Sequence, residues 1–190
     1  MNEHAFWYLS RASGMVAWVI LAITCLWGIL LITRMLKPAD RPAWLLDLHR
    51  WLGVLSLVTT GAHMAALVGD NYVHFGWREL FVPQASEWKA GPVTWGVLAF
   101  YVMVVVELTS LVMKKLPKKL WHGIHLLSYP MFVMASVHGF SGTDAGNKVF
   151  VLAATAVMAI FSCTLLARVL QGRAKQAQRA ANRAQPAGLG

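Results

Sequence analysis

The sequence predicts an all-α protein, an integral membrane bundle of five transmembrane helices. Two observations predict this class. The 190 residues are 57% hydrophobic and only 13% charged, which is too apolar for an ordinary soluble domain. Five stretches are almost free of charge, and each is long enough to cross a bilayer as a helix. They are residues 12–33, 51–69, 90–113, 120–143 and 149–167.

Polar and aromatic segments separate these stretches. Residues 1–11 lack a basic leader and an obvious cleavage site, so the first stretch is expected to remain as a permanent helix. Residues 70–92 are rich in aromatic side chains and are expected along the outer surface, with a short interfacial helix. The pattern divides the chain into a transmembrane domain, residues 1–171, and a basic, mobile tail, residues 172–190.

Basic residues gather on one predicted side of the membrane. Thirteen of the 17 follow the first, third and fifth stretches, and the positive-inside rule places that side in the cytoplasm. The N-terminus is then outside and the C-terminus inside, in the inner (plasma) membrane of a bacterium. Topology alone explains the net charge of +9, so we expect no nucleic-acid partner. The thirteen are Arg34, Lys37, Arg41, Arg50, Lys114, Lys115, Lys118, Lys119, Arg168, Arg173, Lys175, Arg179 and Arg183.

Four histidines lie in the spans formed by the apolar stretches, the second of which is expected to begin near Trp44 and so to include His49; ionisable groups there are costly and often functional. His49 and His63 are 14 residues apart, and His125 and His138 are 13 apart. Each spacing covers roughly 20 Å of helix, against a hydrocarbon core of about 30 Å. Each pair therefore places one histidine near the inner membrane face and the other near the outer face.

The predicted topology decides which histidines meet. The second and fourth stretches both pass from inside to outside, so His49 should face His125 and His63 should face His138. Each such pair can hold one haem iron through two axial imidazoles. This ligation leaves no open coordination position, which favours electron transfer over oxygen binding. Two haems stacked across the membrane would form an electron conduit.

Helix phase supports one pair better than the other. Fourteen residues return His63 to within about 40° of the His49 face, whereas thirteen residues miss by about 140° on an ideal helix. Pro130 lies between His125 and His138, and we expect a proline kink there to change the phase.

Four sequence motifs resemble the ferric-reductase-like transmembrane superfamily: WYLSRASG at residues 7–14, LHRWLG at 48–53, GAHM at 61–64 and LWHGIHLLSYPMFVMASVHG at 120–139. The superfamily includes ferric reductases, the membrane half of NADPH oxidases and the haem-binding membrane subunit of bacterial methionine sulfoxide reductase. The resemblance extends over about residues 6–170. It implies b-type haem between two parallel helices and electron transfer across the membrane.

The expected function is that of a di-haem b-type cytochrome, the membrane subunit of a reductase. The chain shows no G-x-G-x-x-G fingerprint, so the donor should be a separate flavin reductase or a quinol, and the extracytoplasmic acceptor should also be separate. No catalytic residue is assigned. The alternative is a transporter or channel for metal ions or protons that uses the same histidines. Such a pathway would more often add carboxylates, and only Glu107 is available.

Four further residues are candidates for secondary roles. Arg50 and Arg11 could pair with the inner and outer haem propionates, and simple anchoring at the interface is the alternative for both. His122 shares the helix face of His125 and could contact a propionate or replace a ligand, although a polar interfacial histidine is the favoured interpretation. Glu107 could be functional or could pair with a nearby lysine.

Overall fold

Long helices form most of the described chain. The computed structural model describes residues 5–33, 43–70, 75–142 and 146–184, and no strand occurs in these ranges. The expected cationic loop with Arg34, Lys37 and Arg41, as well as His74 and Thr143, lie outside them. The helices are α1 (Ala5–Thr33), α2 (Ala43–Val68), α3 (Trp77–Phe81), α4 (Ala90–Leu111), η1 (Met113–Lys115), α5 (Lys118–His125), α6 (Ser128–Ser141) and α7 (Lys148–Ala184).

Four helices, α1, α2, α4 and α7, are long and apolar enough to cross a membrane. Their outer faces carry large apolar side chains, and the exposed fractions of Leu111, Val149 and Leu152 are 72%, 78% and 73%. Such continuous apolar exposure is unfavourable in water and natural in lipid. The chain is therefore an all-helical, multi-pass membrane protein.

The fourth expected span, residues 120–143, is not one continuous helix. It consists of α5 and α6, with a break at Leu126 and Leu127. The break lies one turn before Pro130, which has no N–H to donate to the Leu126 carbonyl and whose ring clashes with it. Two hydrogen bonds there reach back three residues instead of four and tighten the chain. They run from Leu127 N to Ile124 O at 2.9 Å and from Tyr129 N to Leu126 O at 3.2 Å.

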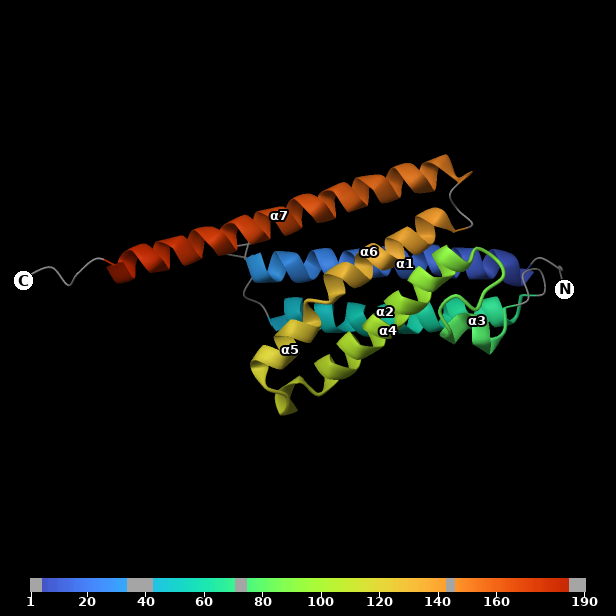
Figure 1. The fold of residues 1–190 in the computed structure, drawn as a ribbon, viewed down its shortest axis with the longest axis horizontal. Coiled ribbons are helices and arrows are strands. Elements are labelled where there is room, and N and C mark those ends of the chain that lie inside the picture. The colour runs from blue at the N-terminus through green and yellow to red at the C-terminus, as the bar shows by residue number, and fades with distance from the viewer. Residues whose placement is uncertain (1–4, 34–42, 71–74, 143–145, 185–190) are drawn as a thin grey trace, which may run out of the picture.

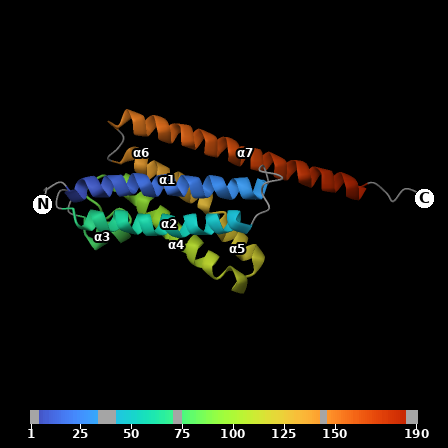
Figure 2. The ribbon, with the colours of Figure 1, turned by 180° about the vertical axis from the view of Figure 1, so that it is seen from behind.

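Antiparallel packing positions the histidines. α1 packs most extensively along α2, and α4 packs along α6 (Figures 1 and 2). A buried cluster that includes Leu21, Ile29, Met103, Phe132 and Phe161 joins α1, α4, α6 and α7. Interhelical hydrogen bonds add to this packing, as expected in lipid. They join Trp18 Nε1 to Ser136 Oγ at 3.0 Å, Thr24 Oγ1 to Ser56 Oγ at 3.3 Å, and Trp27 Nε1 to the Leu45 carbonyl at 3.0 Å.

The two ends of the bundle differ. At one end lie η1, α5 and the start of α2, and we call it the basic end because Lys114, Lys115, Lys118 and Lys119 lie there. At the opposite end, the expected short helix is present as α3. Its Leu80 and the neighbouring Phe75 pack on Val93 and Val97 of α4, so this loop closes over the bundle.

The last helix is longer than expected. α7 has 37 residues, about 55 Å, and its C-terminal part extends beyond the rest of the bundle (Figure 1). Our expected tail begins at residue 172, yet the helix continues through that position to Ala184. Residues 185–190 lie outside the described ranges.

Cysteine labelling tests the orientation that the charge distribution predicts. Gly146→Cys lies before α7, where a side chain meets no atom within 4 Å, and Ala174→Cys lies on the exposed far part of α7. In a Cys163→Ala background, an impermeant thiol reagent added to intact cells should label Gly146→Cys and leave Ala174→Cys unlabelled. Both should react after lysis. The reverse pattern in intact cells would invert the assigned direction.

Candidate functional site

Two histidine pairs meet inside the bundle, one towards each end. The rings of His49 on α2 and His125 at the end of α5 have centroids 6.0 Å apart. The rings of His63 on α2 and His138 on α6 have centroids 6.4 Å apart. The two pairs expected from topology are therefore brought together. The break between α5 and α6 allows both His125 and His138 to face α2 despite their 13-residue spacing.

Backbone carbonyls of neighbouring helices fix the rings of the pair at the opposite end. His63 Nδ1 lies 2.8 Å from the Ser10 carbonyl, and His138 Nδ1 lies 2.8 Å from the Pro92 carbonyl. A carbonyl only accepts, so each Nδ1 must carry the proton and donate it. In a neutral ring, Nε2 then has a free lone pair, which is the state that binds a metal.

The pair at the basic end is held differently. His125 Nδ1 lies 3.3 Å from Ser110 Oγ, and the Trp121 ring stacks on the His125 ring with centroids 5.2 Å apart. The Thr24 carbonyl is the backbone acceptor that faces His49. The buried Nδ1 atom of His49 nevertheless lacks a partner at hydrogen-bonding geometry among the described residues.

Glycines make room for three of the rings. Side-chain carbons placed on Gly14 and Gly28 of α1 would lie 3.0 Å and 3.1 Å from the rings of His63 and His49. One placed on Gly96 of α4 would lie 2.7 Å from His138 Nδ1. The contact at Gly96 is closer than a real Cβ atom allows, and those at Gly14 and Gly28 are tighter than nearly all real Cβ contacts, so a side chain at any of the three would push against its ring.

A cavity surrounds the His63–His138 pair. Its volume is about 190 Å³, and its walls come from α1, α2, α4, α6 and the α3 loop. Met103 and Phe100 line it on α4, while Arg11 and Glu79 supply charged groups. It is mostly apolar, as prosthetic-group sites usually are.

The donor set fits a haem better than a bare metal ion. Each pair supplies two imidazoles, and nowhere in the described residues do three His, Cys, Asp or Glu side chains converge. A structural zinc site needs four protein ligands, whereas a porphyrin supplies the remaining ligands itself. With imidazole nitrogens at about 2 Å from a metal, the ring centres lie roughly 6 Å apart, as they do here. α2 and α6 are not among the closely packed helix pairs, so the imidazole pairs bridge helices whose backbones lie apart.

Comparison with known proteins identifies the class. Residues 13–136 match the family described as the ferric reductase like transmembrane component. The match covers most of the chain, so the chain belongs to this family of membrane electron-transfer components, which generally bind haem. It includes His49, His63 and His125 and ends two residues before His138. No curated protein and no solved structure gives a significant match.

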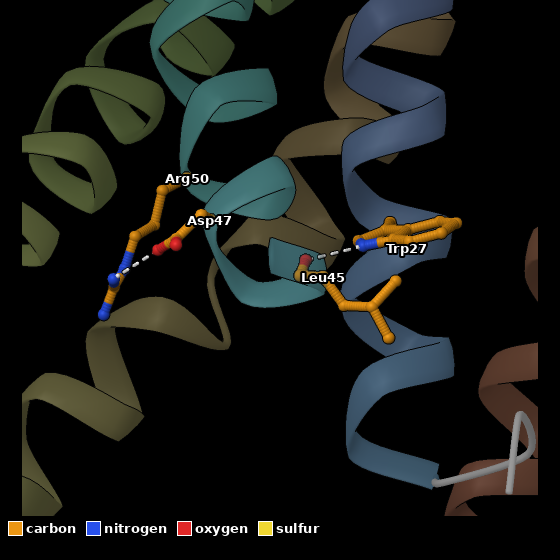
Figure 3. A network of polar contacts seen from close by, with 4 residues as sticks. All are labelled: Trp27, Leu45, Asp47 and Arg50. Carbon is orange, nitrogen blue, oxygen red and sulfur yellow. Dashed lines mark hydrogen bonds and ion pairs between the residues drawn. The ribbon is translucent and has the colours of Figure 1, made fainter. Parts of the chain in front are cut away.

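The secondary candidates lie in different surroundings. Arg50 forms an ion pair with Asp47 at 2.9 Å, and both side chains are more than half exposed (Figure 3). Arg11 lines the cavity and lies 4.5 Å above the Trp7 ring centre. His122 is exposed beside Trp121 and makes no ring contact with His49.

Glu107 and Arg168 have surroundings that the sequence did not predict. The Glu107 carboxylate points at Gly53 of α2, where an added side-chain carbon would lie 2.7 Å from Oε1. The described residues contain no ion pair between Glu107 and a lysine. Arg168 of α7 lies within electrostatic range of His125, and its guanidinium lies 5.0 Å above the Tyr129 ring centre. Sequence reasoning assigned Arg168 only to topology.

A pair of glycine substitutions tests the close approach of helix and ring. Gly96→Val should displace His138 and lower the haem retained per purified chain, whereas Gly61→Val should not, because nothing lies within 4 Å of a carbon on Gly61. Both positions are helical, so the backbone effect is matched. Pyridine haemochrome spectra give the haem content. Equal retention in the two variants would contradict the packing role of Gly96.

Proposed function

We propose that this chain is a di-haem b-type cytochrome and the electron-carrying membrane subunit of a reductase. One b haem would be held by His49 and His125 near the basic end, and the other by His63 and His138 near the opposite end. The observation that supports this most is the pair of imidazole–imidazole contacts at matched depths, with ring centres 6.0 and 6.4 Å apart.

The hydrogen bonds of the Nδ1 atoms support the ligand assignment. A bound haem would supply one-electron redox chemistry, and the two histidine pairs are the residues that would hold it. The protein's part is to present Nε2 lone pairs in a dry site, and the Ser10 and Pro92 carbonyls fix that tautomer for two of the four rings. Arg11, on the cavity wall, is placed to offset a propionate charge. Arg50 already pairs with Asp47, which favours an anchoring role at the interface.

The proposed direction of electron flow rests on the orientation that the charge distribution predicts. The basic end faces the cytoplasm of a bacterium, and electrons enter there from a separate flavin reductase or from a membrane quinol. Exposed lysines at that end suit an acidic donor or anionic lipid. Electrons leave near His63 and His138, where the α3 loop and the C-terminal end of α6 border the exit. These segments would form the surface for an extracytoplasmic acceptor.

Alanine substitutions test the pairing directly. His63→Ala or His138→Ala should remove about half of the haem and leave the basic-end haem, because one axial ligand is lost. His49→Ala or His125→Ala should remove the other half. His122→Ala is the matched control: this histidine is exposed and is interpreted as a polar interfacial residue, so the variant should keep both haems. Two full haem equivalents in His49→Ala protein would refute the assignment.

Vesicles test the conduit. The 190-residue chain alone should not oxidise NADPH, and dithionite should reduce its haems. With a flavin reductase or quinol supplied on the basic side and ferricyanide sealed on the other, ferricyanide should be reduced across the membrane. Vesicles with His63→Ala protein should lose this activity. NADPH turnover by the isolated chain would contradict the need for a separate donor, and reduced haems without ferricyanide reduction would contradict the conduit.

A further inference from the structure

The carbonyls that bind His63 and His138 share one local pattern. Ser10 precedes Gly14 by four residues on α1, and Pro92 precedes Gly96 by four on α4. In an α-helix the side chain of a residue lies back over the preceding turn, so residue i+4 normally covers the carbonyl of residue i. A glycine at i+4 leaves that carbonyl open, and its second lone pair can accept a hydrogen bond from another helix.

The pattern repeats after 14 residues, nearly four helical turns, so the repeats lie on one helix face. On α1, Ser10 and Gly14 are followed by Thr24 and Gly28, which face His49. This spacing equals the separation of His63 and His49 on the antiparallel helix α2. The match places a glycine of α1 against each histidine of α2, although only His63 makes the hydrogen bond to a carbonyl there.

On α4 the same step leads from Pro92 and Gly96 to Val106 and Ser110, but here the glycine is replaced by serine. Ser110 Oγ donates to the Val106 carbonyl at 2.7 Å. Its proton is thereby used, so the oxygen can only accept from His125 Nδ1, 3.3 Å away. The Ser110 hydroxyl therefore lies between the Val106 carbonyl and the His125 ring. At the other three histidines a glycine stands in this position and leaves a notch, that is, no side chain between the carbonyl and the ring.

We propose that Ser110 is the positioning residue of the basic-end centre. It connects the Val106 carbonyl to the N–H of His125, fixes the tautomer with Nε2 unprotonated, and makes the imidazole a stronger electron donor. A hydrogen bond at the remote ring nitrogen raises ligand basicity. A more basic ligand stabilises oxidised iron and lowers its reduction potential. This inference rests on the proposed haem ligation by His125.

Redox titration of the full-length haem-loaded protein tests the role of Ser110. The redox transition of the basic-end haem is identified from His63→Ala protein, which is expected to keep only that haem. Ser110→Ala leaves a methyl group over the Val106 carbonyl and no acceptor for Nδ1, so the basic-end potential should rise while the other redox transition stays. Ser110→Gly recreates the notch found at Gly14, Gly28 and Gly96, and should return the potential towards the original value. Thr155→Ala is the matched control, because Thr155 Oγ1 on α7 makes the same type of bond, to Val151 O at 2.7 Å, at an exposed position. It should shift neither redox transition.

The outcomes separate the two proposals. A wild-type protein without haem would overturn the proposed function. Two results would overturn the role of Ser110 and leave the proposed function standing. One is two bound haems with an unchanged basic-end reduction potential in Ser110→Ala, and the other is an equal shift of that potential in Ser110→Ala and Ser110→Gly. Should Ser110→Ala lose the basic-end haem, Ser110→Gly decides: retention of that haem near its original potential supports the role, and its loss overturns it.

Discussion

The site depends on finding hydrogen-bond acceptors for imidazole N–H groups inside an apolar bundle. A buried donor without a partner costs free energy, and backbone carbonyls are the acceptors that a helix can offer without placing another polar side chain in lipid. Ser10 and Pro92 offer such carbonyls to His63 and His138. The glycines one turn later expose these carbonyls and let the helices approach closely. Packing of α1 on α2 and of α4 on α6 is thus tied to the orientation of the rings.

The broken fourth segment follows from the same requirement. A continuous helix would turn His138 away from the face of His125 by about 140°. At the break at Leu126 and Leu127, hydrogen bonds reach back three residues instead of four. This changes the rotation of the following side chains about the helix axis and the direction of the chain. Both rings can then meet α2 within one bundle. Pro130 serves the site through a missing N–H rather than through any contact with it.

The bundle is closed unevenly, and this suits a protein that holds a large flat group. The pairs α1–α2 and α4–α6 are closely packed, whereas α2 and α6 are not, and a cavity lies beside His63 and His138. Apolar side chains, some of them from the α3 loop, form most of the wall of this cavity. Redox partners would then meet the protein near the ends of the bundle, through the lysines at the basic end and through the α3 loop at the other.

The sequence by itself determined the helical class, the apolar helices, the family resemblance and the pairing of His49 with His125 and of His63 with His138. These features depend on composition and on the spacing of residues within single segments, and both can be read directly from the sequence. It predicted a kink at Pro130, but not that residues 120–143 form two separate helices, nor that α7 continues to Ala184. Only the tertiary structure decided which groups hold the rings: Ser10, Pro92 and Ser110, with Gly14, Gly28 and Gly96. Their role depends on the register between antiparallel neighbouring helices. The sequence of one helix does not predict which carbonyl of the neighbouring helix will lie against its histidine.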